Sequence, residues 1–357
     1  MYYITIGLLL TSYFYIGNKY LDSKYSSIIY FPAFYIYWFI LGFQYDIGTD
    51  YDSYIEIAKI GSYAYSENNN EWLFVLLLDI LKILSLPPQS LFMVVGIIQT
   101  FLAFFLFHKL SKYNMKVWLI FFLFITVSTI YHNQMNGIRQ FISLLSVPIL
   151  YIFILEKKYI KSFIISLFAL GFHNSFLIIL ALLPVFLWFK NITKKTSFLF
   201  FILSPIVIIF TFDIIFTFVI EYLFSNYSIY LEKDTKLTYV GILTKAYYIP
   251  LFFYFWYLYL NNKNSTFTNN DLFKFFILVF SITYCFLIMG LYFSLGARIF
   301  QYFILFYIFP IYYIIDYLIK ENSQFALIVV FIYVLFPYIV KTVFLPVREY
   351  SFQTILF

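Results

Sequence analysis

Twelve long apolar runs, separated by short polar loops, fill most of the chain and constrain its fold more than any other feature. A membrane-spanning helix needs about 20 mostly apolar residues, whereas a spanning strand is short and alternates apolar with polar residues. These runs are apolar on all sides, which predicts helices. They cover residues 2–17, 27–43, 71–85, 89–107, 117–131, 138–155, 162–189, 197–221, 241–260, 272–293, 299–319 and 324–345.

The composition agrees with a chain that lies in a membrane. Hydrophobic residues make up 63% of the sequence and charged residues 11%, whereas soluble domains contain about 25% charged residues. This excludes a soluble globular protein. It predicts an all-α, polytopic transmembrane helical bundle of about 10–12 membrane helices, with residues 1–357 as a single integral membrane domain. The N-terminus lacks the features of a signal peptide, so we expect an uncleaved first span.

Few residues are suited to metal or cofactor binding. The chain has one cysteine, Cys285, and three histidines, so neither a disulfide framework nor a metal site is expected. No glycine-rich Walker loop is present, and we predict no cofactor. The formal charge of +6 includes no basic block, which argues against nucleic acid as a partner.

The placement of lysines predicts the topology, because basic loops stay on the cytoplasmic side of a membrane. The basic loops are residues 18–25, 108–116, 156–161, 190–195 and 261–274. They can all face the cytoplasm only if the run 162–189 is interrupted and the run 71–85 does not cross the bilayer.

Both conditions have support in the sequence. The run 162–189 contains the polar segment 171–175, so we expect a broken helix there, and broken helices often line polar cavities. The run 71–85 is short and carries Asp79 and Lys82, so we expect a re-entrant or interfacial helix. Both termini and the loops 44–70 and 222–240 are then periplasmic.

The arginines are the first candidate site residues. Lysine outnumbers arginine twenty to three, and Arg139, Arg298 and Arg348 all fall on the predicted outer side. Arg139 and Arg298 lie at the starts of apolar helices. A guanidinium group grips a phosphate through two hydrogen bonds, and a helix N-terminus adds its dipole to such a site. The alternative is that an arginine only reaches a lipid headgroup or pairs with an acidic residue.

His173 is the second candidate, because it interrupts an otherwise apolar run. A polar side chain at that depth needs a wet cavity or a partner, so His173 either belongs to a site or bridges two helices. His132 lies in the turn before Arg139 and either joins the site or is exposed.

The first predicted outer loop combines carboxylates with tyrosines. Asp50, Tyr51 and Asp52 follow one another, and Glu71 closes the loop. Aromatic faces stack on sugar rings, while carboxylates accept hydrogen bonds from hydroxyl groups and can act as a base. This pattern favours carbohydrate over a metal ion as the ligand.

Several short motifs, in this order, resemble the EpsG-like group of bacterial polysaccharide polymerases, the Wzy-type O-antigen and exopolysaccharide repeat-unit polymerases. The motifs are Gly48-Thr49-Asp50-Tyr51, Arg139-Gln140, Phe172-His173-Asn174-Ser175 and Gly296-Ala297-Arg298-Ile299-Phe300-Gln301-Tyr302-Phe303. One departure is the loop 222–240, which is much shorter than the large periplasmic loops of many such polymerases and ligases.

The resemblance implies a reaction and a cellular location. The growing glycan would move from undecaprenyl pyrophosphate to the non-reducing end of a new lipid-linked repeat unit, at the periplasmic face of a bacterial inner membrane. The implied partners are the undecaprenyl-pyrophosphate-linked oligosaccharide, membrane lipids and a chain-length regulator protein.

The resemblance also implies roles for particular residues. Arg139 and Arg298 would stabilise the diphosphate. The base would be Asp50, Asp52, Glu71 or His173, although for His173 we slightly prefer a contact with the anion. The predicted catalytic residues are Arg139, His173, Arg298 and Asp50, and the predicted substrate-binding residues are Tyr51, Asp52, Glu71, Gln140 and Tyr302.

Two other functions remain open from the sequence. A polyprenyl-phosphate-sugar-dependent transferase that adds one sugar would also have an acidic first outer loop. A lipid-linked oligosaccharide flippase or other transporter should show charges near mid-membrane and two related halves. Apart from Asp213, the mid-span positions are almost free of charge, which favours the polymerase.

Overall fold

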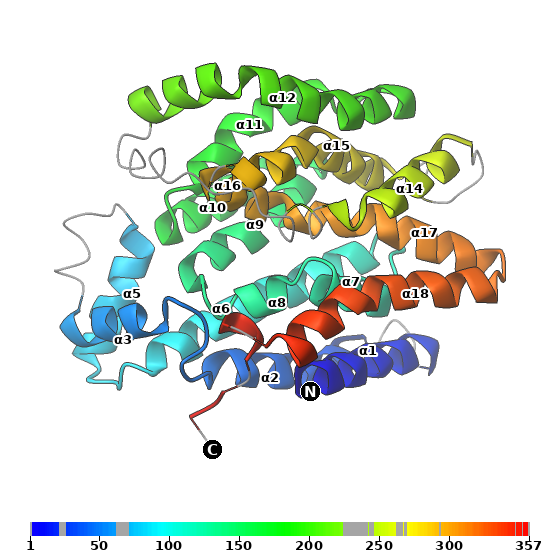
Figure 1. Cartoon of the computed structure of the whole chain (residues 1–357). Helices are drawn as coiled ribbons and strands as arrows, with labels where there is room; N and C mark the ends of the chain where they lie inside the picture. Colours follow the sequence, from blue (N-terminus) through cyan, green and yellow to red (C-terminus); the bar gives the residue numbers. More distant parts are fainter. Residues whose placement is uncertain are drawn as a thin grey trace. The chain divides into compact units, whose positions relative to one another are not determined.

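The computed structural model describes residues 2–20, 26–61, 71–223, 242, 246–261, 267, 270–292, 294–346, 348–351 and 353–355 (Figure 1). The chain forms two compact units, Met1–Ile179 with Ile328–Phe357 and Leu180–Leu327. The predicted outer loop 222–240 lies outside the described residues except for its first two, as do residues 62–70 and the side chain of Arg348.

The first unit is built from helices of very different lengths. They are α1 (Tyr2–Tyr20), α2 (Ser26–Gly42), α3 (Tyr51–Ile60), α5 (Trp72–Ile83), α6 (Ser90–Ser111), α7 (Val117–Thr126), α8 (Ile130–Asn133), α9 (Ile138–Leu155), α10 (Tyr159–Phe172), the start of α11 (Phe176–Trp188) and most of α18 (Gln324–Ile339). An isolated antiparallel bridge joins Gln44 to Thr354.

The second unit is also built from helices, which turns and loops connect in the described residues. It contains the rest of α11, α12 (Lys194–Leu223), α14 (Ile249–Asn261), α15 (Asp271–Tyr292), α16 (Ser294–Phe303), a 3-10 turn (Ile304–Tyr307) and α17 (Ile308–Lys320). Aromatic side chains fill its core. The Phe280 ring, for example, meets the Tyr307 ring edge-on, with centroids 5.1 Å apart. Such pairs stabilise a core beyond the area they bury.

These helices confirm the predicted fold class, a polytopic helical membrane bundle. Five segments are long and apolar enough to cross a bilayer, and shorter apolar helices accompany them in the described part of the chain. The five are Ser90–Ser111, Ile138–Leu155, Asp271–Gly290, Gly296–Lys320 and Gln324–Phe344. The periplasmic placement of the termini and the single membrane domain remain predictions.

The loops 108–116 and 156–161 lie at the same end of the first unit, which agrees with their predicted common side. Glu156 follows α9 and accepts hydrogen bonds from Lys109 at 3.0 Å and Lys158 at 2.5 Å. The hydroxyl of Tyr113 also donates to Glu156, at 3.2 Å. The start of α9 lies about 27 Å from this cluster, because a helix rises about 1.5 Å per residue.

The predicted break in the run 162–189 is confirmed. Helix α10 ends at Phe172, His173 has an extended backbone (φ −157°, ψ 118°), and α11 begins at Phe176. The hydroxyl of Ser143 in α9 donates to the carbonyl of Ala169 at 2.7 Å, which fixes the end of α10 against α9. His173 therefore lies at a helix end, beside the start of α9.

Helix α5 is a separate short helix, as expected for the run 71–85. Its 12 residues span about 18 Å, less than the hydrocarbon thickness of about 30 Å. Gly171 allows α10 to approach it, since a Cβ at this position would lie 2.6 Å from Cγ of Leu73. This contact brings the end of α10 to the start of α5.

Candidate active site

Glu71 is the centre of a cluster of charged side chains in the first unit. It precedes α5, and only 2% of its surface is exposed. One carboxylate oxygen accepts a hydrogen bond from Nη1 of Arg139, and the other lies 2.5 Å from Nδ1 of His173. The backbone N–H of Asn174 also points to the second oxygen, at 3.4 Å. The carboxylate thus joins three segments that are distant in the sequence.

All three charged residues occupy helix ends. Glu71 is the residue before α5, Arg139 is the second residue of α9, and His173 follows α10. The positive charge of Arg139 lies at a helix N-terminus, where the helix dipole is unfavourable to a cation. The carboxylate of Glu71 compensates, because it is in direct contact with the guanidinium group and opposite charges attract strongly where little water lies between them. The Arg139 and His173 side chains stay 20% and 19% exposed, so a ligand can reach them.

Aromatic rings hold the guanidinium group in place. Its central carbon lies 5.6 Å from the centre of the Tyr54 ring and 5.2 Å from that of Phe74, within cation–π range. Nε of Arg139 donates to the Tyr54 hydroxyl at 3.5 Å. Burial raises the pKa of Tyr54, and the nearby positive charge of Arg139 only partly opposes this. Tyr54 therefore remains a neutral hydroxyl that accepts from Arg139.

The loop that carries Asp50 is fixed to the turn before α9. Oδ1 of Asn136 accepts hydrogen bonds from the backbone N–H groups of Thr49 at 2.7 Å and Asp50 at 3.1 Å. Gly48 has φ +86°, and a Cβ there would collide with the Asn136 side chain, so glycine is required. Asp50 precedes α3 and is half-buried. Its negative charge contributes to the raised pKa of Tyr54, whose burial is the main cause.

Tyr51 is held by contacts with other residues of the first unit. Its hydroxyl donates to Gln89 at 3.0 Å, and its ring stacks on Phe92 with centroids 4.9 Å apart. The side-chain amide of Gln89 donates in turn to the carbonyls of Gln44 at 2.9 Å and Gly42 at 3.1 Å. The buried ring of Tyr51 is therefore occupied by protein, whereas a sugar-stacking residue needs an open face.

The structure brings some of the predicted site residues together and gives others surroundings that differ from the prediction. Glu71, predicted to contact substrate, is buried and has both oxygens engaged. Arg139 was expected to be either an anion contact or an acid-paired arginine, and the structure shows the pair with Glu71. Asp52 is exposed on α3, and Gln140 is half-buried beside Arg139.

Arg298 and Tyr302 both lie in α16 of the second unit. Gly290 and Gly296 let α15 and α16 pack closely, because a Cβ on Gly296 would lie 2.9 Å from the carbonyl carbon of Met289. Arg298 lies in α16 and is exposed. Tyr302 is only 1% exposed, so its predicted contact with substrate has no open surface in this conformation.

His132 neither joins the site nor is exposed, so both expectations for it were wrong. Its side chain is fully buried, and its ring centre lies 4.5 Å from that of Tyr3 and 4.9 Å from that of Tyr350. Nε2 lies 3.0 Å from the Tyr338 hydroxyl. Burial lowers the pKa of His132 to about 3, so this ring is neutral at physiological pH. Its aromatic neighbours come from distant parts of the chain, so the sequence around His132 does not reveal them.

Three further residues hold the site, although the sequence did not single them out. Asn136 fixes the Asp50 loop, Gln89 fixes Tyr51, and Tyr54 contacts Arg139. Weak signals existed, since Asn136 precedes a glycine and Gln89 follows two prolines at the start of an apolar run. Neither pattern identifies the residue that it contacts.

The fold and the cluster define a multi-pass helical membrane protein with a Glu–Arg–His cluster at its helix ends. The family model described as EpsG family matches residues 27–354, so the chain belongs to the EpsG family. This confirms the resemblance seen in the short motifs and makes the chain a polymerase-like membrane protein of exopolysaccharide or O-antigen biosynthesis. No curated protein and no solved structure matches the chain.

Proposed function

We propose that the protein is a polysaccharide repeat-unit polymerase of the bacterial inner membrane. It moves the growing glycan from undecaprenyl pyrophosphate to the non-reducing end of a new lipid-linked repeat unit at the periplasmic face. The observation that carries this proposal is the Glu71 carboxylate, which holds Arg139 and His173 side by side. A cation for a leaving pyrophosphate and a base for an acceptor hydroxyl are the two groups that this transfer needs.

The proposed step is a substitution at the anomeric carbon of the donor glycan. The bond between this carbon and the pyrophosphate oxygen breaks, and a bond to the acceptor hydroxyl oxygen forms. The hydroxyl proton moves to Nε2 of His173. Negative charge develops on the leaving pyrophosphate, and Arg139 stabilises it; preorganised donors of this kind often provide a large part of catalysis. Arg298, in the second unit, remains a predicted contact of a diphosphate.

The contact between Glu71 and His173 favours His173 as the base over the anion contact that we preferred from the sequence. Nδ1 donates to the carboxylate, which leaves the lone pair of Nε2 free to accept a proton. The same carboxylate stabilises the imidazolium that forms, as in other carboxylate–histidine pairs. Glu71 itself is a poor base because both of its oxygens already accept hydrogen bonds.

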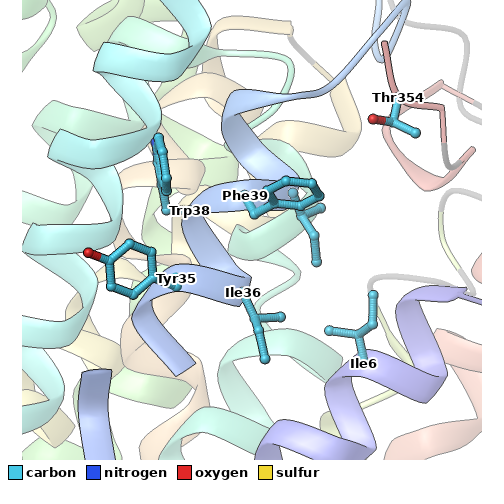
Figure 2. Close-up of a pocket in the computed structure, with 7 residues that line it drawn as sticks. Ile6, Tyr35, Ile36, Trp38, Phe39 and Thr354 are labelled. Atoms are coloured by element: carbon cyan, nitrogen blue, oxygen red, sulfur yellow. The ribbon is translucent and has the colours of Figure 1, made fainter. Parts of the chain in front are cut away.

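The polyprenyl tail of the substrate needs an apolar groove, and the first unit has one. A groove of about 340 Å³ is lined by Ile6 of α1 and by residues of α2, with Thr354 at its rim (Figure 2). Figure 2 shows Ile36 and Phe39 on the side of α2 that faces Ile6 and Thr354. Thr354 is bridged to Gln44, at the start of the loop that leads to Asp50. This bridge links the rim of the groove to the chain segment that leads to Asp50.

Filling this groove should weaken the binding of long-chain substrates. We expect Ile36→Trp to raise KM for an undecaprenyl-linked repeat unit, with a smaller effect on an analogue with a short lipid. Ile332→Trp is the control, since Ile332 is similarly apolar and 63% exposed but lies on α18, outside the groove. Equal KM values for both variants and both lipid lengths would place the tail elsewhere.

The proposed function is tested directly with purified protein in vesicles and a purified lipid-linked repeat unit as the only substrate. A ladder of lipid-linked polymers is expected without nucleotide sugar or ATP. Products that stop after addition of one sugar, and only from a polyprenyl-phosphate sugar, would indicate the single-sugar transferase. Movement of the lipid across the bilayer without any new glycosidic bond would indicate the transporter.

A further inference from the structure

A polar cavity lies in the second unit, at loops that we predict to be cytoplasmic. It measures about 330 Å³ and lies between the start of α12, the end of α14 and the start of α15. Three lysines line it, namely Lys190, Lys194 and Lys274, together with the polar residues Asn191, Thr193 and Asp271. The predicted basic loops 190–195 and 261–274 thus meet at one cavity.

Positive charge exceeds negative charge in this cavity. Lys274 pairs with Asp271 at 3.1 Å, but the Asp271 side chain is 92% exposed, so water screens this pair strongly. Lys194 is more enclosed, and its ammonium group lies 4.5 Å from the centre of the Tyr259 ring and donates to the Tyr259 carbonyl at 3.3 Å. Burial lowers the pKa of Lys194, and the charge of Lys274 lowers it further. A bound anion would relieve this repulsion.

The helices around the cavity favour an anion as well. Helix α12 begins at Lys194 and α15 begins at Asp271, so two long helices start at the cavity. The N-terminus of a helix carries a partial positive charge, and it binds phosphate groups readily when cationic side chains are also present. The two helix N-termini and the lysines therefore all favour the binding of an anion.

The surroundings indicate a membrane surface as the source of the anion. Trp188, just before Lys190, is 85% exposed, and Tyr257, just before Tyr259, is 64% exposed. Exposed tryptophan and tyrosine gather at the level of lipid headgroups. Basic pockets between helices on the cytoplasmic side are a common way to bind anionic headgroups.

We propose that the cavity formed by Lys190, Lys194 and Lys274 is a phosphate-binding site that takes the headgroup phosphate of an anionic phospholipid. The proposal does not depend on the polymerase activity. The site would anchor the second unit to the cytoplasmic leaflet by a specific contact, beyond the general attraction between lysines and anionic lipid.

Native mass spectrometry of the full chain, with phosphatidylglycerol and phosphatidylcholine of equal chain length, tests this proposal. The wild type should retain more phosphatidylglycerol, and Lys194→Gln should reduce that retention about fivefold. Lys195→Gln is the matched control, because Lys195 is the next residue, carries the same charge and does not line the cavity. If Lys194→Gln does not fold, the exposed Lys190→Gln replaces it. The proposal would be overturned if Lys194→Gln and Lys195→Gln reduced the retention of phosphatidylglycerol equally. It would also be overturned if the wild type retained both lipids equally and did not respond to inorganic phosphate.

A second measurement separates the two sources of phosphate. Inorganic phosphate is added to lipid-free protein in detergent, with chloride of equal ionic strength as the reference, and the unfolding temperature is recorded. No difference between the salts, together with preferential retention of phosphatidylglycerol, supports the lipid source. A rise with phosphate that Lys194→Gln abolishes, without any lipid preference, would overturn the lipid source and assign the cavity to a soluble phosphate compound.

Discussion

Arg139→Ala is expected to leave single repeat units where the wild type makes long polymer. Removal of one preorganised donor from a developing negative charge typically slows catalysis by about 10²–10³-fold. Arg139 is held by Glu71 on one side and by the rings of Tyr54 and Phe74 on the other, so its position before the reaction is fixed. The rate of polymer formation by purified variants, at saturating acceptor, measures the effect.

Two companion variants show whether charge or packing is responsible. Arg139→Lys keeps the charge but loses the planar group that can contact Glu71 and a phosphate together, so it should recover only part of the rate. Tyr54→Phe removes one hydrogen bond to Arg139 and should raise the activation free energy of transfer by about 1 kcal/mol at most. Long polymer from Arg139→Ala at the wild-type rate would refute the role of this arginine.

Glu71→Gln is expected to affect both stability and activity. The carboxylate is almost completely buried, and its loss leaves Arg139 without its counter-charge, which should lower the free energy of unfolding by about 3 kcal/mol. The glutamine amide keeps only one acceptor oxygen, so either Arg139 or Nδ1 of His173 loses its partner, and the transfer rate should fall as well. The unfolding temperature and the polymerisation rate report the two effects separately.

A His173→Gln variant distinguishes a base from an anion contact. If His173 is the base, this change should abolish transfer while the lipid-linked substrate still binds, because glutamine cannot accept the hydroxyl proton. The transfer rate and the substrate binding of the purified variant measure the two effects. His132 cannot take over as the base, because it is fully buried among aromatic rings. A His173→Gln variant that loses substrate binding but keeps the rate at saturation would make His173 an anion contact instead.

A double-mutant cycle completes the test of Glu71. Glu71 also holds Arg139, so the variant Glu71→Gln/His173→Gln should be slower than His173→Gln alone. If Glu71 acts partly through His173, the loss in the double variant should still be clearly smaller than the sum of the two single losses, because residues that work as one unit are non-additive. Additive losses would show that Glu71 and His173 act independently.

The helical membrane fold could be predicted because hydropathy is a local property. Each apolar run must become a helix in a bilayer, since its backbone polar groups find partners only within the segment. The break at His173 could also be predicted, because polar residues within an apolar run and lysines on both sides are visible in the sequence alone. The separation of α5 from the spanning helices followed from its length in the same way.

The pairing within the site could not be predicted, because it depends on contacts between distant segments. Glu71 and Arg139 are 68 positions apart, and Glu71 and His173 are 102 positions apart. Their meeting depends on Gly171, which lets α10 approach Leu73, and on the bond from Ser143 to Ala169. Similar short contacts decide that Tyr51 binds Gln89 and that His132 lies among tyrosines.

The sequence by itself determined that this is a helical membrane protein whose polar residues gather at helix ends, because the cost of burying charge in a bilayer applies to every residue separately. It also singled out His173 by the same cost, Arg139 by the rarity of arginine in the chain, and Asp50 by its place beside tyrosines in a polar loop. Only the tertiary structure decided that Glu71 is the buried centre joining Arg139 to His173. A carboxylate gains this role from the charges that packing brings within hydrogen-bonding distance, and packing is set by helix contacts that no local pattern encodes.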